Sequence, residues 1–281
     1  MNRLAKDEVE MLRVWDRIAP RFRQRYLSRG GARYHFKEFA YRVVYGELIA
    51  QTIQTLPRRS FILKTDSWNE GVEDGRNLIS YATGLSNNVD RTAVCMDVSR
   101  YVCEAASRIR SSEFAIVRAT LLASPFRPVF DLIIDASTVD HMPLRLRKLW
   151  LSAETSVLKP HGVLLVSFDC RLNMFTELYH RLFTRKIYPE WTLTPTEVRG
   201  QLESLGLSIL REHAIFVAGF IWGSHRPSFI LTRLFRRRGV LEFIKNRELS
   251  RNSKWLSFLA PQYVIVAMKM PHASKVSSQD S

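Results

Sequence analysis

The sequence lacks any run of about eighteen apolar residues, the length that a helix needs to cross a bilayer. The segment MNRLAKDEVEMLRVWDR, residues 1–17, carries charges throughout, so it has no apolar centre of the kind found in a signal peptide. We therefore expect neither a membrane span nor a secretory leader, and we expect the protein to be cytoplasmic.

Cysteine is scarce and scattered. Cys95, Cys103 and Cys170 include no CxxC pair, and no histidines cluster at the spacing of a metal site. This pattern indicates a reducing compartment and no bound metal.

Acidic residues are few beside the basic ones: 27 Asp and Glu stand against 42 Lys and Arg, a formal net charge of +15. Arginine dominates the excess and clusters in residues 13–33, 145–148 and 233–238. A field of this sign attracts polyanions or an anionic membrane surface. Three interpretations stay open: a solvated basic surface, contact with an anionic membrane or substrate, and contact with nucleic acid.

The clearest pattern lies between residues 130 and 169. Residues 130–134 (FDLII) form a short apolar run followed by small and polar residues, as where a buried parallel strand ends in a loop. Residues 144–158 have the period of an amphipathic helix, and Pro160 and Gly162 separate it from a second strand at 163–168. Because ligands of parallel sheets lie beyond the carboxyl ends of the strands, we expect the segment after the first strand to form the functional edge.

Helices are predicted on both sides of this unit. Residues 8–26 and 36–56 have helical apolar patterns, with Pro20 as a kink or break in the first helix. Near the end of the chain, a helix capped by Thr196 and a strand are predicted over TLTPTEVRGQLESLGLSIL.

These motifs resemble those of class I S-adenosylmethionine-dependent methyltransferases. FDLII…STVDH…LKPHGVLLVSF is similar to the fourth strand, the helix and the fifth strand of that superfamily. AVCMDVSRYVCEAA resembles its second strand with the acidic end, and IVRATLLASPF resembles its third strand and loop. The order of elements fits from residue 60 to residue 269. The resemblance implies an α/β fold, with a Rossmann-like, seven-stranded, mostly parallel sheet and helices on both faces.

The same resemblance implies a domain organisation. Residues 1–57 would form an N-terminal helical extension that either lies across the cofactor site or caps the sheet. Residues 58–270 would form the methyltransferase domain, with a helical insertion at about 216–258, and residues 271–281 a disordered tail.

The first loop departs from the usual pattern of the superfamily. FILKTDSWNEGVEDGR, residues 61–76, has Lys64 in the usual acidic place, and Asp66 and Trp68 stand where glycines are expected. The loop resembles a divergent branch of the superfamily that reads LKTDLFDEA. On that resemblance Lys64, Asp66, Asn69 and Glu70 contact S-adenosylmethionine, and a carboxylate pairs with its amino group. The alternative is a loop that no longer binds the cofactor.

The resemblance also assigns residues to the ribose and the adenine. Asp97 stands where the family's acidic residue accepts hydrogen bonds from both ribose hydroxyls; the alternative role is a helix N-cap, for which Ser99 is better suited. Thr120 occupies the place of the aspartate that binds the adenine amino group. Val98 and Leu121 would contact the adenine faces.

Residues 135–141 would lie under the methyl sulfonium and the acceptor, beginning with Asp135 as a cofactor contact. His141 is the best candidate for a general base because histidine titrates near neutral pH. The alternative is that His141 shapes the loop or lines the acceptor pocket. Asp140 would either orient His141 or cap the helix that begins near Pro143.

Several functions remain open. The first is a methyltransferase that acts on a small-molecule or lipid-like acceptor. The second is a non-catalytic binding or regulatory protein that retains the fold. RNA methylation is disfavoured, because the sequence has no RNA-binding module and no NPPY-like motif, and nucleic acid is an unlikely partner. The amphipathic, arginine-rich stretch at residues 229–238 fits a peripheral position on an anionic membrane.

Overall fold

The computed structural model describes residues 3–28, 36–68, 91–110, 114–123, 126–179, 181–182, 191–215, 246, 260 and 262–271. One seven-stranded sheet forms the centre of the described part, with the strand order β3-β2-β1-β4-β5-β7-β6. The strands are β1 (Ser60–Lys64), β2 (Arg91–Asp97), β3 (Ala115–Arg118), β4 (Phe130–Ala136), β5 (Leu158–Asp169), β6 (Leu207–Ile215) and β7 (Gln262–Lys269).

The sheet is mostly parallel. Strands β1 to β5 pair in parallel, whereas β7 is antiparallel to both of its neighbours, β5 and β6. The predicted Rossmann-like sheet with its N-terminal helices is therefore confirmed. The described helices are α1 (Arg3–Ser28), α2 (Phe36–Gln54), α5 (Arg100–Arg110), α6 (Leu144–Val157), α7 (Met174–Tyr179) and α8 (Pro195–Ser204).

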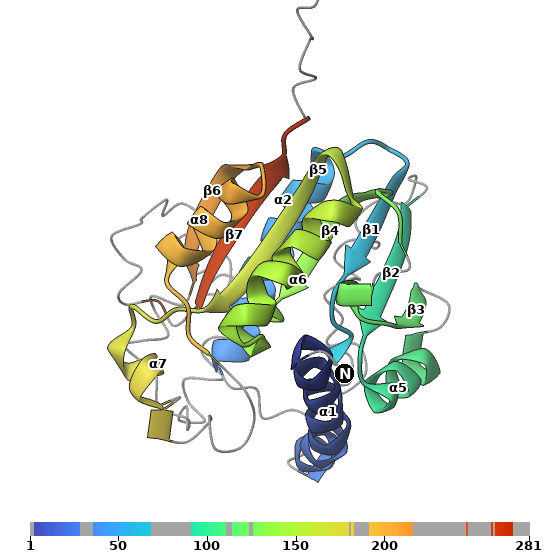
Figure 1. Cartoon of the computed structure of the whole chain (residues 1–281), viewed down its shortest axis with the longest axis vertical. Coiled ribbons are helices and arrows are strands. Elements are labelled where there is room, and N and C mark those ends of the chain that lie inside the picture. Colours follow the sequence, from blue (N-terminus) through green and yellow to red (C-terminus); the bar gives the residue numbers. More distant parts are fainter. Residues whose placement is uncertain are drawn as a thin grey trace, which may run out of the picture.

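Helices cover both faces of the sheet, with α6 and α8 on one side and α2 on the other (Figure 1). Successive side chains of a strand point to opposite faces, so the core is divided into two layers. Leu164 of β5 packs in the layer that contains Trp150 of α6, and Leu165 packs in the layer that contains Leu48 of α2. Among the described helices, none is long and apolar enough to cross a membrane.

Two local predictions change. Helix α1 continues through Pro20, so this proline does not end it. Strand β5 begins at Leu158, and Pro160 and Gly162 lie inside the strand. At Gly162 a Cβ atom would lie 3.0 Å from the main-chain oxygen of Phe130, so the close approach of β4 selects glycine there.

The N-cap of α8 is Thr194 and not Thr196. The Thr194 hydroxyl accepts a hydrogen bond from the Glu197 main-chain nitrogen, and Glu197 Oε2 accepts one from the Thr194 nitrogen. This reciprocal pair leaves Pro195 at the first helical position, where its missing N–H costs nothing. The proposed insertion at 216–258, apart from residue 246, and the tail from residue 272 onward lie outside the described residues.

Candidate functional site

The loops after β1, β2 and β4 meet at one edge of the sheet. Strands β2 and β4 flank β1 on its two sides, so the chain changes direction across the sheet at β1. Parallel sheets bind ligands at such a switch point, beyond the carboxyl ends of the strands. The three loops contain most of the residues that the sequence nominates for a cofactor.

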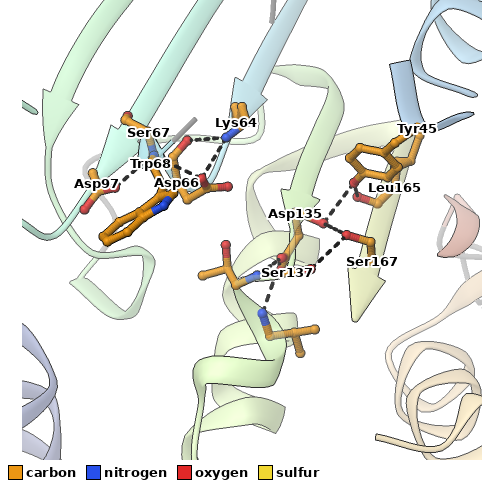
Figure 2. A network of polar contacts seen from close by, with 12 residues as sticks. Tyr45, Lys64, Asp66, Ser67, Trp68, Asp97, Asp135, Ser137, Leu165 and Ser167 are labelled. Atoms are coloured by element: carbon orange, nitrogen blue, oxygen red, sulfur yellow. Dashed lines mark hydrogen bonds and ion pairs between the residues drawn. The ribbon is translucent and has the colours of Figure 1, made fainter. Parts of the chain in front are cut away.

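An internal ion pair shapes the loop after β1. The Lys64 side chain is fully buried, and its ammonium donates hydrogen bonds to Asp66 Oδ1 and to the Asp66 main-chain oxygen, both at 2.8 Å. Asp66 Oδ1 also accepts a hydrogen bond from the Trp68 main-chain nitrogen at 3.2 Å. Figure 2 shows this turn. The side chains of Lys64 and Asp66 hold its conformation, at the place where the resembled superfamily usually has glycine. Asn69 and Glu70 lie outside the described residues.

Asp97 ties the β1 loop to the end of β2. Its Oδ2 accepts a hydrogen bond from the Ser67 nitrogen at 2.9 Å, and its Oδ1 accepts one from the Ser99 nitrogen at 2.8 Å. Burial raises the pKa of Asp97 to about 7, the Asp66 carboxylate raises it as well, and the two main-chain donors oppose the shift. Ser99 caps α5 through a hydrogen bond from the Val102 nitrogen to its hydroxyl, as the sequence predicts.

The residues nominated for adenine lie in the loops after β2 and β3. The Thr120 hydroxyl accepts a hydrogen bond from the Leu122 nitrogen at 3.2 Å, within a short 3-10 turn over Leu121–Ala123. Leu121 is buried and Val98 is half-buried. The Thr120 hydroxyl therefore already has one role in shaping its own loop.

The Asp135 side chain is hydrogen-bonded to the loop after β4. Its side chain is fully buried, and its Oδ1 accepts hydrogen bonds from the main-chain nitrogens of Thr138 at 2.6 Å and Val139 at 3.3 Å. Its Oδ2 accepts a hydrogen bond from the Trp150 indole at 3.3 Å. Through its hydrogen bonds to Thr138 and Val139, Asp135 positions the turn that carries His141.

Glu154 is a buried carboxyl group that sequence reasoning missed. The helical pattern places it among the charged residues of α6, yet its side chain is fully buried in the same region as Asp135 and Trp150. Burial raises its pKa well above the usual value, and the negative charge of Asp135 raises it further. Burial likewise raises the pKa of Asp135 to about 6. The only sequence signal is that Glu154 follows Trp150 by four residues, on the same side of the helix.

Asp140 connects the β4 loop to β5. Its Oδ2 accepts a hydrogen bond from the Asp169 nitrogen at 2.9 Å, and the N-cap position of α6 is Pro143. The expected cap role of Asp140 is therefore wrong, because its carboxylate is turned toward the neighbouring strand. His141 Nε2 lies 3.9 Å from Asp140 Oδ1, beyond hydrogen-bonding distance, and its side chain is 21% exposed.

Hydroxyl groups line the other side of the β4 end. The Tyr45 hydroxyl of α2 donates a hydrogen bond to the Asp135 main-chain oxygen at 3.0 Å, and the Ser137 and Ser167 hydroxyls lie 3.4 Å apart (Figure 2). Ser137 has a φ of 64°, an uncommon backbone conformation for a residue with a side chain. Such backbone strain gathers at functional sites.

Helix α1 lies over these loops. The Trp15 ring packs edge-on against His141, with ring centroids 4.7 Å apart, and against Trp68 at 5.7 Å. Phe22, two turns further along α1, also packs against Trp68. Asp16 accepts a hydrogen bond from the Ser99 hydroxyl at 2.7 Å. Helix α1 therefore contacts the loops after β1, β2 and β4.

Comparison with known proteins identifies similar folds only. No protein-family model and no curated protein matches the chain. A TehB-like SAM-dependent methyltransferase from Corynebacterium glutamicum matches with a TM-score of 0.50 and 13% identity, over 90% of this chain and 98% of that chain. The cyclopropane synthase MmaA2 from Mycobacterium tuberculosis matches with a TM-score of 0.53 and 12% identity, over 80% and 83%.

A third similar structure contains ligands. The 1,6-didemethyltoxoflavin-N1-methyltransferase from Burkholderia thailandensis, with 1,6-didemethyltoxoflavin and S-adenosylhomocysteine bound, matches with a TM-score of 0.50 and 11% identity, over 89% of this chain and 87% of that chain. At these identities the similarity shows the fold alone.

Proposed function

We propose that this chain, which has the fold of the class I S-adenosylmethionine-dependent methyltransferases, binds S-adenosylmethionine and methylates a small-molecule or lipid-like acceptor. The observation that carries the proposal is the position of Asp97. Its carboxyl group ends β2 beside the β1 loop, at the switch point of the sheet. The bound S-adenosylhomocysteine of the Burkholderia thailandensis enzyme supports the same class of ligand for this fold.

The carboxyl groups of the site suit the polar parts of the cofactor. An ionised carboxylate has about four acceptor positions, and Asp97 uses two of them for the Ser67 and Ser99 nitrogens, so ribose hydroxyls can use the others. Asp66 Oδ2 is buried and has no hydrogen-bond partner within the described part of the chain. An ammonium group such as that of the cofactor's methionine end would satisfy it.

S-adenosylmethionine supplies an already activated methyl group, so the protein mainly has to position the acceptor and exclude water. His141 is the base candidate for an acceptor that carries a proton. It lies in the β4 loop to which Asp135 is hydrogen-bonded, and the Trp15 ring packs against it.

Calorimetry with S-adenosylhomocysteine tests the proposal. We expect micromolar or better affinity, and we expect Asp97→Ala to weaken it roughly 30-fold, since a lost charge-assisted hydrogen bond costs about 2 kcal/mol. Asp131→Ala is a matched control: Asp131 is a buried acid whose Oδ2 accepts a main-chain hydrogen bond from Phe61, but it lies at the opposite end of β4. The control should alter stability and leave affinity unchanged. Undetectable binding by the wild-type protein at millimolar ligand would refute the proposal.

Two observations favour the second candidate, a binding or regulatory protein without catalysis. The Lys64 ammonium lies inside the site. Trp15 of α1 packs on Trp68 and His141, at the edge where a ligand would enter. Absence of S-adenosylhomocysteine binding in a well-folded protein would favour this candidate.

A further inference from the structure

Two buried polar side chains lie on the last strands of the sheet, away from the three loops described above. His213 of β6 is 7% exposed and Gln262 of β7 is 8% exposed. Within the described residues, neither imidazole nitrogen of His213 has a hydrogen-bond partner, and neither does Oε1 of Gln262. In native proteins nearly all buried polar groups form hydrogen bonds with other protein groups or with water. Two neighbouring side chains without such bonds therefore need an explanation.

Both side chains belong to the face of the sheet that α2 covers. Arg211, two residues before His213, bonds to Gln51 of α2, and Val264, two residues after Gln262, packs in the α2 layer of the core. The intervening residue Glu212 points to the other face, where it pairs with Arg199 of α8. Alternation along a strand therefore places His213 and Gln262 on one side.

The ladder between β6 and β7 makes them neighbours. Ile215 is opposite Gln262, and His213 is opposite Val264, so the two polar residues are diagonal partners with Cα atoms roughly 7–8 Å apart. Both lie near the carboxyl end of β6, which runs in the same direction as β5 and β4. Val264 also pairs with Ser167 of β5, on the side away from His213. The Ser167 hydroxyl donates a hydrogen bond to the Asp135 main-chain oxygen at the end of β4 (Figure 2).

The chemistry of the pair selects a neutral hydroxyl group. Burial, and then the charge of Arg211, lower the pKa of His213, so the imidazole is uncharged at pH 7 and offers one donor and one acceptor. Gln262 Oε1 offers an acceptor. A hydroxyl group is donor and acceptor at once and can satisfy both residues, whereas a buried ion would meet no opposite charge in this pair.

We propose that His213 and Gln262 form a binding site for a hydroxyl group of the methyl acceptor. That the hydroxyl group belongs to a methyl acceptor rests on the proposed function. That His213 and Gln262 bind a hydroxyl group does not depend on it. Strand β6 is three strands from β4, and adjacent strands are about 4.8 Å apart, so the bound hydroxyl lies roughly 14 Å from the β4 loop. The residues therefore bind the remote end of an extended acceptor, and the methylated atom lies at the other end.

A matched pair of probes tests the site in the full-length chain. Phenol and anisole differ only in the methyl group that blocks the hydroxyl, and their dissociation constants can be measured by NMR titration of protein labelled with ¹⁵N-histidine. We expect phenol to bind about tenfold more tightly than anisole, which corresponds to one net hydrogen bond, and to shift the His213 side-chain resonances. Gln262→Leu and His213→Phe should each reduce the preference severalfold, whereas Glu212→Gln, on the opposite face, should preserve it.

Equal binding of phenol and anisole by the wild-type chain, or an undiminished preference in Gln262→Leu, would overturn the proposal. The wild-type titration and Gln262→Leu decide the question even if His213→Phe fails to fold. S-adenosylhomocysteine affinity, measured on the same proteins, should be unchanged in Gln262→Leu. A hydroxyl preference in a chain that binds no S-adenosylhomocysteine would refute the methyltransferase function and support the hydroxyl site.

Discussion

The charged residues of the β1 loop depend on each other. Lys64 is fully buried and its ammonium contacts both the carboxylate and the main-chain oxygen of Asp66. A pair of this kind costs much to break by removing one partner, because the other charge is left buried and uncompensated. Any substitution at Asp66 made to probe ligand binding therefore also probes the fold of the loop.

We expect Asp66→Asn to lower the free energy of unfolding by about 3 kcal/mol, measured by urea denaturation, because it leaves the Lys64 ammonium without its counter-charge. The double variant Lys64→Met, Asp66→Asn removes both charges and should recover much of that loss. If Asp66→Asn is as stable as the wild type, the ion pair contributes nothing and Asp66 is available to a ligand.

The raised pKa values of Asp97 and Asp135 predict how stability depends on pH. These pKa values are about 7 and about 6 in the folded chain, against 3.8 for an ordinary aspartate. Between about pH 4 and pH 7 the folded chain therefore binds more protons than the unfolded chain, so the free energy of unfolding falls as pH rises through this window.

Asp97→Asn should make this fall shallower, since an amide cannot ionise, although its single acceptor oxygen cannot replace both carboxylate oxygens as partners of the two main-chain nitrogens. Denaturant titrations at several pH values measure the slope independently of the offset. Parallel pH profiles for the wild type and the variant would show that Asp97 does not titrate in this range.

At the scale of elements, local capping chemistry decides where α8 begins. Thr194 and Glu197 satisfy each other's main-chain nitrogens, and Pro195 opens the helix between them. Thr196, two residues later, is exposed within the first turn. The two threonines therefore form a natural pair for comparison.

Thr194→Ala should destabilise the protein by about 1 kcal/mol, the usual loss for an N-cap. Thr196→Ala should change the free energy of unfolding by less than about 0.5 kcal/mol, as expected for an exposed position. Chemical denaturation of both variants under one condition provides the measurement, and equal effects at the two positions would contradict the assigned cap.

Helix α1 shows how an element acquires its role from its contacts. Its apolar residues predict only an amphipathic helix, but Trp15 and Phe22 pack on Trp68 and Asp16 bonds to Ser99. Together with the contact between Trp15 and His141, these interactions attach the helix to the loops after β1, β2 and β4.

At the scale of the whole molecule, the excess of positive charge produces a long-range electrostatic field. The net charge of +15 raises the affinity for anionic surfaces wherever the basic groups lie, and the stretch RLFRRR at residues 233–238 concentrates it in the sequence. This stretch lies outside the described residues, so the membrane role stays a prediction from sequence.

We expect the protein to co-sediment with vesicles that contain anionic lipid and to be released at high salt, because each basic residue near a charged bilayer contributes about 1 kcal/mol. The variant Arg236→Glu, Arg237→Glu, Arg238→Glu should bind markedly less. Replacing three other arginines with exposed side chains, Arg17, Arg58 and Arg108, with glutamate gives a control of equal charge change. If both triple variants lose binding equally, net charge and not this stretch is responsible.

The sequence by itself determined the fold and the edge where a ligand would bind. Apolar runs such as residues 130–134, separated by amphipathic helices, are sufficient for a parallel sheet, because strand period and connection handedness are local rules. The acidic end of β2 was likewise readable, since Asp97 directly follows its strand.

Only the tertiary structure decided which side chains meet. Glu154 is fully buried although its helix reads as amphipathic, because α6 packs on the sheet with Trp150 hydrogen-bonded to Asp135 of β4. Trp15 reaches His141 across 126 positions of the sequence. His213 and Gln262 become neighbours through the register of two antiparallel strands. Sequence periodicity specifies which face of an element is apolar, but pairings between distant elements depend on crossing and register, which no local pattern contains.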